Sequence, residues 1–527
     1  MIYHCEDHTC NYWDEGEKLP ERCPQCGRKL LRANEADMTG DDWTALGNTL
    51  WDAEASDKKR MVDCFRKAAY LGSAWGVCNL GICMEQGNGV EADPVQAFWL
   101  YQQAVEMGSL NAVCCLGVCY QYGIGTAPDA KQAAELYCKA AEYGSSRGQM
   151  LLARAFHDGI GVEADAAEAV HWVRAAAYQR YGEGMHRLGV CYEYGDGVEQ
   201  NWEHAVHWFR EAAESGVSVA MTDLGYCYEK GCGVEQSWEQ AFSWYRRGAE
   251  CGNPVSMSNL GLCYQRGYGV EQNWQEAIKW YEQGAQCGDL QSMHNLACCY
   301  ERGEGVKQNM TEAIRWYTAA AEGGNADDMY NLGWQYDHGE GVEQDMKKAI
   351  CWYERAAEQN YPAAMNSLGE CYAMGRGVPR DLETAMEWYR RAAELGEAMA
   401  DYNMGWHLEQ AGKLSEAYAH YRKAADGNDD SAWWALGRFY ENGVVVAQDG
   451  KEARRCYETG EKLGSVKCKM RLARCKLLGI GGRRAKKAGL DLCRQALELA
   501  KESSEKEDYG YEAEMNLLRR TIAENES

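Results

Sequence analysis

Apolar residues recur along most of the chain at three- and four-residue steps, as the segment around Leu224 shows. Its apolar or small residues are Ala220, Leu224, Gly225, Cys227 and Tyr228. This spacing predicts a helix with one buried face. The sequence Gly-Cys-Gly-Val follows at 231–234. It predicts the end of the helix, because glycine adopts the left-handed C-cap conformation without steric cost.

A second helix is predicted directly after this turn. Its apolar stripe consists of Ala241, Trp244, Tyr245 and Ala249, and the sequence Cys-Gly-Asn at 251–253 ends it. The small residues Gly225 and Ala241 would allow the two helices to approach closely. The segment is therefore predicted to form an antiparallel helix pair, which must stack on its neighbours to bury both of its faces.

The pattern has a fixed period. Leucines, most of them followed by glycine, stand 36 residues apart at Leu80, Leu116, Leu152, Leu188, Leu224, Leu260, Leu296, Leu332 and Leu368. Met404 takes the next place, and looser copies are centred on Leu46, Leu436 and Leu472, which makes thirteen units. The step from Met404 to Leu436 is only 32 residues, because the glycine-rich turn is contracted at 410–413.

The repeated unit resembles the Sel1-like repeat, a relative of the tetratricopeptide repeat. The residues that carry the resemblance are Leu188-Gly189, Tyr192, Gly195, Gly197-Val198, Ala205, Trp208-Phe209, Ala212-Ala213 and Gly216, with equivalents in nearly every copy. The resemblance implies an all-α fold, a right-handed α-α superhelix (α-solenoid) of about thirteen helix pairs. We expect the array to span residues 37–501 and a capping helix to lie in 502–527, with Met515, Leu517, Leu518 and Ile522 on its apolar face.

Composition agrees with one short unit used many times. The chain has 57 glycines and 7 prolines, and its aromatic residues are 33 Tyr and 19 Trp but only 6 Phe. The net charge of −25 disfavours nucleic acid as a partner, because an acidic surface repels phosphate. Residues 451–501 differ, with 15 Lys and Arg against 5 Asp and Glu. No run of about 18 apolar residues is present, so no membrane span is expected.

Eight of the 25 cysteines share one position of the repeat, three residues after the leucine: Cys83, Cys119, Cys191, Cys227, Cys263, Cys299, Cys371 and Cys475. We interpret them as small buried hydrophobic residues. The odd number of cysteines and the lack of a signal-peptide pattern at the start predict a cytoplasmic protein.

The first 36 residues lie outside the repeat and contain two cysteine pairs. Cys5 and Cys10 are followed, after twelve residues, by the sequence Cys-Pro-Gln-Cys-Gly at 23–27. Two such pairs can form a tetrahedral metal site, and a segment this short needs a metal in order to fold alone. The segment resembles a zinc ribbon, which implies a structural zinc ion bound by Cys5, Cys10, Cys23 and Cys26, with His8 as an alternative ligand.

In tetratricopeptide-type arrays the first helix of each pair lines the concave surface, and by this resemblance the candidate binding residues lie there. One residue before the leucine stand Asn79, Asn259, Asn295, Asn331 and Asn403, whose carboxamides can both donate to and accept from a peptide backbone. Positions two before, two after and six after the leucine form a stripe on the same face. Its predicted anchors, of residue types common in interfaces, are Arg302, Tyr330, Trp334, Tyr402, Trp406, Trp434 and Arg438.

These features predict a non-enzymatic adaptor or scaffold that binds a peptide or protein in a concave groove, and homo-oligomers are compatible with it. The alternative is a nucleic-acid-associated regulator that uses the zinc ribbon and the basic cluster Arg483, Arg484, Lys486 and Lys487. No catalytic residue is predicted. The string Gly-Ser-Ser-Arg-Gly at 144–148 matches a serine-hydrolase elbow only by its letters. No nucleophile, base and orienting group stand at a plausible spacing.

Overall fold

The structure is a computed structural model, and it describes residues 2–5, 13–15, 30–33, 35–51, 55–506 and 512–526. The chain divides into two compact units, residues 1–280 and 281–527, and each is described by itself. Three short strands come first: β1 (Ile2–Cys5), β2 (Trp13–Glu15) and β3 (Leu30–Ala33). β1 pairs antiparallel with both of the others, so the sheet order is β2-β1-β3.

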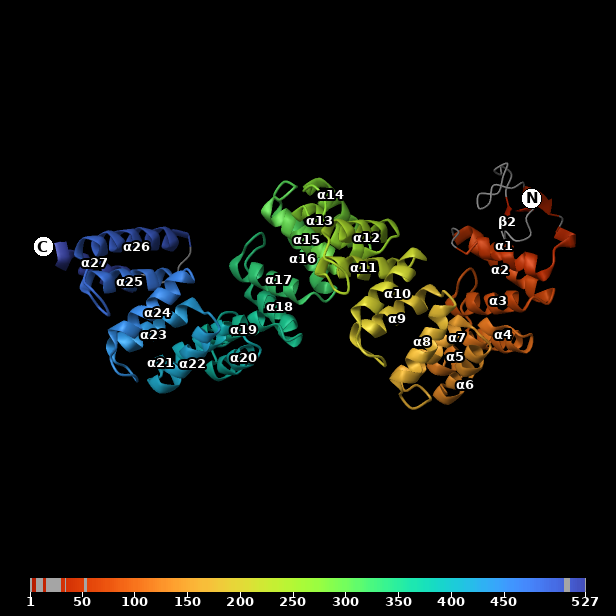
Figure 1. Ribbon diagram of the computed structural model, residues 1–527, viewed down its shortest axis with the longest axis horizontal. Helices are drawn as coiled ribbons and strands as arrows, with labels where there is room; N and C mark the ends of the chain where they lie inside the picture. The colour runs from red at the N-terminus through yellow and green to blue at the C-terminus, as the bar shows by residue number, and fades with distance from the viewer. Residues whose placement is uncertain are drawn as a thin grey trace. The chain divides into compact units, whose positions relative to one another are not determined.

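Helices follow, after a 3-10 turn at Glu35–Asp37 (Figure 1). In the first unit they are α1 (Gly40–Thr49), α2 (Ala55–Tyr70), α3 (Ala74–Gln86), α4 (Pro94–Glu106), α5 (Leu110–Tyr122), α6 (Ala130–Glu142), α7 (Ser146–Asp158), α8 (Ala166–Tyr178), α9 (Gly182–Tyr194), α10 (Trp202–Glu214), α11 (Ser218–Lys230), α12 (Trp238–Glu250) and α13 (Pro254–Arg266). The division between the units falls within α14 (Trp274–Gln286).

In the second unit the helices are α15 (Leu290–Arg302), α16 (Met310–Glu322), α17 (Ala326–His338), α18 (Met346–Glu358), α19 (Pro362–Met374), α20 (Leu382–Glu394), α21 (Ala398–Gln410), α22 (Leu414–Asp426), α23 (Asp430–Asn442), α24 (Gly450–Lys462), α25 (Val466–Leu478), α26 (Lys486–Lys506) and α27 (Glu512–Glu526). Helices α1–α26 alternate as the first and second helices of thirteen repeats. The predicted α-solenoid is therefore confirmed.

Most repeats are closed by contact between the glycine after the leucine and an aromatic ring of the second helix. A Cβ atom added at Gly225 on α11 would lie 2.5 Å from Cε1 of Tyr245 on α12. The Tyr245 side chain is buried, and its hydroxyl group donates a hydrogen bond of 2.8 Å to Glu229 on α11. A buried hydroxyl group requires such a partner. The Glu229 carboxylate therefore makes tyrosine suitable at this core position.

This tyrosine–carboxylate hydrogen bond recurs in both units. The hydroxyl donors and their acceptors 16 residues earlier include Tyr101 and Glu85, Tyr317 and Glu301, Tyr353 and Asp337, and Tyr457 and Glu441. Phe209 takes the tyrosine position in the repeat of Leu188, where its ring abuts Gly189. The recurrent polar partner explains part of the excess of tyrosine over phenylalanine in the composition.

The two glycines of the turn after α11 have different roles. Gly231 ends α11 with a φ of 74°, and its N–H group donates to the carbonyl oxygen of Cys227. Gly233 has a φ of 68°, and a Cβ atom there would lie 2.5 Å from the carbonyl carbon of Trp202, the first residue of α10. The turn of one repeat thus packs on the start of the second helix of the preceding repeat. Glycine is required at 233 by both conformation and space.

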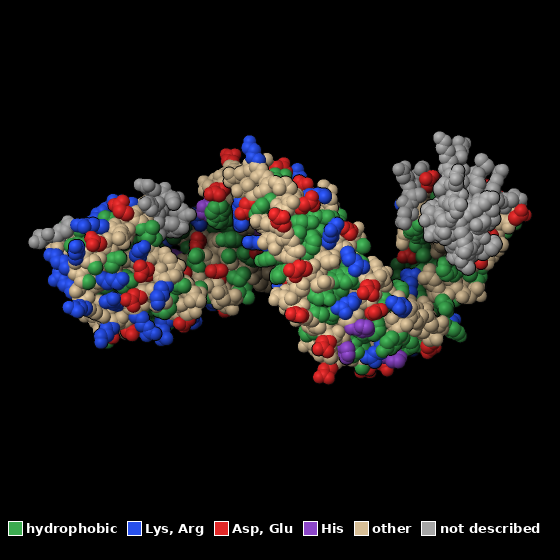
Figure 2. All heavy atoms as spheres, turned by 45° about the horizontal axis from the view of Figure 1, so that its top comes forward, with side chains coloured by type: hydrophobic (Ala, Val, Ile, Leu, Met, Phe, Trp, Pro, Cys, Tyr) green, Lys and Arg blue, Asp and Glu red, His purple; other side chains and the backbone are tan. Residues whose placement is uncertain are grey.

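The final helix, α27, packs on α25 and α26. Met515 and Leu518 are buried in this contact, against a cluster that includes Met470 of α25, while Ile522 is half-buried at its edge. The preceding helix α26 runs to Lys506, beyond the array boundary expected at 501. Figure 2 shows Lys and Arg side chains gathered over this end of the second unit.

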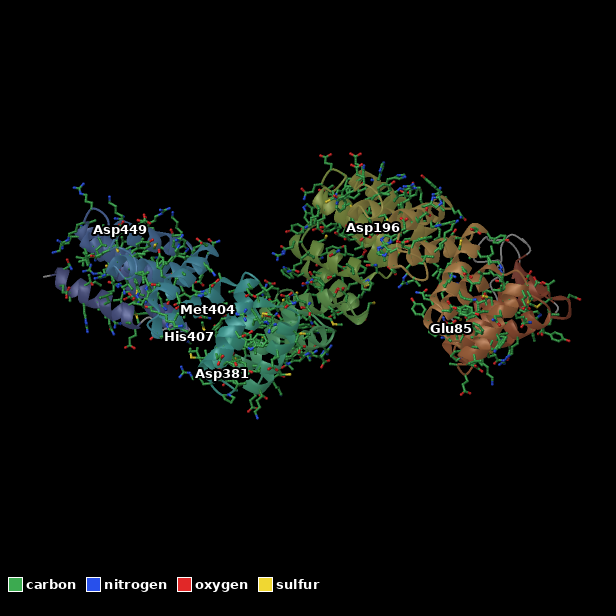
Figure 3. The ribbon with its side chains drawn as sticks, turned by 90° about the horizontal axis from the view of Figure 1, so that it is seen from below. Glu85, Asp196, Asp381, Met404, His407 and Asp449 are labelled. Carbon is green, nitrogen blue, oxygen red and sulfur yellow. The ribbon has the colours of Figure 1, made fainter. Side chains whose placement is uncertain are left out.

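The eight cysteines three residues after the leucine are all buried, with exposed fractions of at most 3%. Burial raises the pKa of Cys83 to about 11 and that of Cys119 to about 12. In the shortened repeat His407 takes this position and Met404 takes the place of the leucine, both on α21 (Figure 3) and both buried. The position serves the packing of the core, which agrees with the interpretation of these cysteines as small hydrophobic residues.

Candidate protein-interaction surface

The candidate binding residues of the second unit lie on its first helices, α15, α17, α19, α21 and α23. We call the surface formed by the positions two before, two after and six after each leucine the first-helix face. It comprises His294, Cys298, Arg302, Tyr330, Trp334, His338, Asn366, Glu370, Met374, Tyr402, Trp406, Gln410, Trp434, Arg438 and Asn442. Helical geometry places the three positions of each helix one turn apart on one side. Successive repeats set these rows beside one another.

Exposure on the first-helix face increases toward the C-terminal end of each helix. Trp334 is 36% exposed, Trp406 is 39% exposed, and Met374, on the helix between them, is 60% exposed. The Trp334 ring stacks on His338, with ring centroids 4.3 Å apart. Large apolar side chains from three successive first helices are thus accessible together, which is a common feature of protein interfaces.

The aromatic residues at the N-terminal end of the face are half-buried instead. Tyr330 packs against Tyr353 and Tyr361, with ring centroids 5.8 and 5.4 Å away. Tyr402 packs in the same way against Tyr421, at 5.6 Å. These two predicted anchors therefore contribute to contacts within the array, and less of each ring is available to a partner.

Trp434 and Arg438 on α23 form a contact of their own. The guanidinium carbon of Arg438 lies 4.6 Å from the centre of the Trp434 ring, and its Nη2 donates a hydrogen bond of 3.0 Å to Glu409. The ammonium group of Lys467 lies on the same ring, 5.2 Å from its centre. Both anchors are half-buried, while Arg302 in the last turn of α15 is exposed.

The predicted asparagines are all half-buried, and some of them bond within the chain. Asn403 donates to Asn366 at 3.0 Å and to Glu370 at 3.2 Å, both on the preceding first helix. Asn295 accepts a hydrogen bond from Gln291. Asn331 lies beside Tyr330 on α17, and Asn259 belongs to α13 of the first unit. For Asn403, the sequence pattern indicated a peptide contact but missed this bond between repeats.

Two acidic residues lie at the base of the face: Glu370, which is one of its positions, and Asp337, which the helical stripe did not indicate. Asp337 is buried and accepts a hydrogen bond of 2.9 Å from Arg376, which also lies 3.9 Å from Glu370. Burial raises the pKa of Glu370, and the hydrogen bond from Asn403 partly offsets this rise. Arg376 belongs to the turn after α19, outside the helical stripe, so the periodicity could not indicate it.

All four residues of the basic cluster near the C-terminus are exposed, but one of them also bonds within the array. Arg483, Lys486 and Lys487 are exposed. Arg484 donates from Nη2 to Asn525 of α27 at 2.7 Å and from Nε to the carbonyl oxygen of Leu477 at 3.2 Å. At least one member of the cluster therefore holds the final helix in place.

The structure does not test the predicted zinc site. Cys10, Cys23, Cys26 and the alternative ligand His8 lie outside the described residues, and Cys5 is described only as the last residue of β1. Within the described ranges, no group of three or more His, Cys, Asp or Glu side chains could hold a metal ion. Over those same ranges, no helix has both the length and the apolar character needed to cross a bilayer.

Comparison with known proteins identifies the family that the repeats resemble. The Sel1 repeat profile matches residues 76–109, 112–145, 146–181, 182–217, 218–253, 254–289, 290–325, 326–361, 362–397, 398–429 and 432–465. No protein of curated function shows significant similarity to the chain.

Two solved structures are similar to this chain in sequence. The crystal structure of c5321, a protective antigen present in uropathogenic Escherichia coli strains displaying an SLR fold, is 30% identical with a TM-score of 0.59. The match covers 81% of this chain and 94% of that one. A Sel1 repeat protein from Oxalobacter formigenes is 31% identical over 46% of this chain and 96% of its own, with a TM-score of 0.43. The repeat matches extend over most of the array, and together with the c5321 similarity they show that the chain belongs to the Sel1 repeat family.

Proposed function

We propose that the protein is a non-enzymatic adaptor whose first-helix face, in the second unit, binds a peptide or protein segment. The observation that carries this proposal is the joint exposure of Trp334, Met374 and Trp406 on three successive first helices. A partner that supplies apolar side chains would cover them. Affinity would come from several shallow contacts of this kind, centred on the two indole rings.

The experiment is affinity purification of the full chain from its native cell, followed by direct binding measurements with each protein recovered. Wild type is compared with the double variant Trp334→Ala and Trp406→Ala. The control is Trp75→Ala with Trp99→Ala, because these tryptophans are 64% and 63% exposed but belong to the first unit. The proposal requires a partner whose affinity falls at least tenfold in the first variant and is unchanged in the control. Retention of every partner by both variants would show that another surface binds.

The alternative function, association with nucleic acid, is supported by the basic end of the second unit (Figure 2). Nucleic-acid binding would weaken steeply as salt is raised, because each phosphate contact releases counterions. Substitution of Arg483, Lys486 and Lys487 by Gln would then abolish it. The substitution of Trp334 and Trp406 would have no effect, so the two functions are distinguishable with the same set of variants.

We also propose, from the spacing of the cysteines alone, that Cys5, Cys10, Cys23 and Cys26 bind one structural zinc ion, with His8 as the alternative to Cys10.

A further inference from the structure

A cysteine, a histidine and an aspartate meet beside α15, the first of the helices that form the first-helix face. His294 and Cys298 lie one turn apart on α15, and the Nε2 atom of His294 is 3.5 Å from the sulfur of Cys298. The Nδ1 atom of His294 is 2.7 Å from Oδ1 of Asp328 on α17. The hydroxyl group of Tyr317 on α16 approaches the same sulfur at 3.4 Å. Three helices thus contribute to one cluster, which the sequence analysis did not recognise.

The three groups differ in exposure in a way that suits an activated thiol. The Asp328 side chain is fully buried, that of His294 is 24% exposed, and Cys298 is half-buried. A buried carboxylate beside Nδ1 fixes the proton on that nitrogen and aims Nε2 at the sulfur. The next residue, Cys299, belongs to the buried core position and is 1% exposed. The two adjacent cysteines therefore have opposite environments.

Charged and titratable groups lie around the cluster on each of the three helices. His294, Glu301 and Arg302 come from α15, Tyr317 comes from α16, and Asp328 comes from α17 with Asp327 beside it. The hydrogen bond with Asp328, and then that with Cys298, raises the pKa of His294 to about 10. Burial raises the pKa of Asp328, and the hydrogen bond with His294 opposes that rise.

The same contacts act on the thiol. Burial opposes ionisation of Cys298, but the hydrogen bonds from His294 and Tyr317 outweigh it and lower the pKa of the thiol. In contrast, burial raises the pKa of Cys299 to about 12. These contacts shift the cluster toward a thiolate beside an imidazolium ion, and the thiolate is the reactive form of a cysteine.

We propose that Cys298 is a site of covalent modification by small electrophiles, specifically of oxidation by hydrogen peroxide to a sulfenic acid. The thiolate attacks one peroxide oxygen, an S–O bond forms, and the O–O bond breaks. The sulfur is oxidised and the peroxide is reduced. The leaving hydroxide takes the Nε2 proton of His294 and becomes water, which leaves the imidazole neutral.

The position of Cys298 favours modification over acyl-transfer catalysis. The residue lies within α15, where backbone N–H groups are engaged in helical hydrogen bonds, so they do not form an oxyanion hole for a tetrahedral intermediate. A sulfenic acid at this site would instead change one end of the first-helix face, one turn from Arg302. The inference goes beyond adaptor function, and it does not require any particular partner.

The test measures the rate of iodoacetamide alkylation of each cysteine in the reduced full chain, by mass spectrometry, between pH 6 and pH 8. At pH values below its pKa of about 8.5, an ordinary thiol reacts about tenfold faster for each unit by which the pH is raised. We expect the rate at Cys298 to rise less steeply with pH than the rate at an ordinary thiol. The exposed residues Cys287 and Cys351 serve as internal references. A rate at Cys298 that rises with pH as theirs does would overturn the proposal.

Variants connect the reactivity to the cluster. His294→Gln should make the rate at Cys298 strongly pH-dependent, and Asp328→Asn should do so to a lesser degree. His338→Gln, on the same face, should leave the rate unchanged. Unchanged reactivity in His294→Gln, which alters a partly exposed residue and leaves the buried aspartate in place, would rule out activation by the histidine.

A second measurement follows the oxidised product. After exposure to one equivalent of hydrogen peroxide, dimedone should label wild type at Cys298 and leave Cys299 unlabelled. Cys298→Ser should abolish the label, and Cys299→Ser should not. If dimedone labels only other cysteines, Cys298 is not the peroxide site.

Discussion

Arg471 of α25 donates two hydrogen bonds of 2.7 Å to Glu514 of α27, from Nε to Oε2 and from Nη2 to Oε1. Its Nη1 also donates to Glu441 of α23, at 3.3 Å. The side chains of Arg471 and Glu514 are only 13% and 9% exposed. Arg474 pairs with the same glutamate, Glu441. A buried network of charges therefore joins the last three odd-numbered helices of the second unit.

The first prediction concerns this network. Glu514→Gln removes the negative charge that pairs with the buried Arg471 guanidinium. Breaking such a pair costs about 3 kcal/mol or more. We expect amide hydrogen exchange in α25 and α27 to become at least tenfold faster. Exchange in α15–α18 should be unaffected, because repeat arrays open locally.

The matched control is Arg390→Ala on α20. Arg390 is 54% exposed and pairs with Glu387 and Glu394 on its own helix. Exposed pairs of this type contribute less than about 1 kcal/mol. If the two variants accelerate exchange around their own sites equally, the buried network has no special role at the end of the array.

The second prediction concerns the tyrosine–carboxylate hydrogen bonds. Tyr245→Phe removes one hydrogen-bond donor to Glu229, which also pairs with Lys230, and should lower the free energy of unfolding by about 1–2 kcal/mol. The repeat of Leu188 offers the reverse change, because Phe209 occupies the tyrosine position there and Glu193 stands at the position of Glu229. Burial raises the pKa of Glu193. Phe209→Tyr should add a donor, lower that pKa and raise stability by about 0.5–1 kcal/mol.

Urea unfolding of the two variants at pH 7, with carboxyl titration by NMR for Glu193, checks this pair of changes. Opposite signs for the two substitutions are required. A loss of stability in both would mean that ring packing against the glycine, and not the hydroxyl group, selects the aromatic residue.

Much of the fold could be predicted because the same signal is repeated thirteen times. The stripe around Leu224 and the glycines after it predict a helix that ends just before 231, and α11 ends at Lys230. Local propensity is sufficient here, since the cap, the apolar face and the turn all lie within one repeat. The partner of Gly233 could not be predicted in the same way, because Trp202 belongs to the preceding repeat.

The candidate surface could be predicted only in part, for a related reason. Helical periodicity identifies the face on which a side chain lies, and not the neighbour that covers it. It therefore could not distinguish the accessible Trp334 from the half-buried Trp434, on whose ring Arg438 and Lys467 lie. Asp328 is 34 residues from His294 in sequence, so the cysteine cluster became visible only when adjacent repeats were placed together.

The third prediction concerns the proposed zinc ion. The reduced full chain should contain about one zinc per molecule, as measured by elemental analysis after removal of free metal. Cys23→Ser combined with Cys26→Ser should abolish zinc retention, since two thiolate ligands are lost. Substitution of the exposed Cys251 and Cys287 by Ser should not.

Single variants would then identify the fourth ligand. Loss of zinc in Cys10→Ser but not in His8→Ala assigns Cys10, and the opposite result assigns His8. A reduced wild-type chain without zinc would show that the segment has another role.

The fourth prediction concerns pH. Asp429 caps α23, and it accepts a hydrogen bond of 2.7 Å from the N–H group of Ala432. Burial raises the pKa of Asp429 to about 6, and the negative charge of Asp430 adds to this rise, while the bond from Ala432 opposes it. The ordinary value is about 3.9. The folded state therefore binds the proton more tightly than the unfolded state does. The stabilisation from this proton is fully present below pH 4 and is lost as the pH rises through 6.

Asp429→Asn should remove this dependence without removing the cap, because Asn325 caps α17 in the same way. The free energy of unfolding of the variant minus that of wild type should be larger at pH 7.5 than at pH 4.5. The increase should be about 1–2 kcal/mol after allowance for partial solvent screening. Asp429→Ala serves as the control, since it loses the cap bond at every pH and should cost about 1 kcal/mol at pH 4.5. Urea unfolding at both pH values measures the difference. If the stability difference between Asp429→Asn and wild type is the same at pH 4.5 and 7.5, the carboxyl group ionises without cost in the folded protein. Burial at this cap would then not govern its pKa.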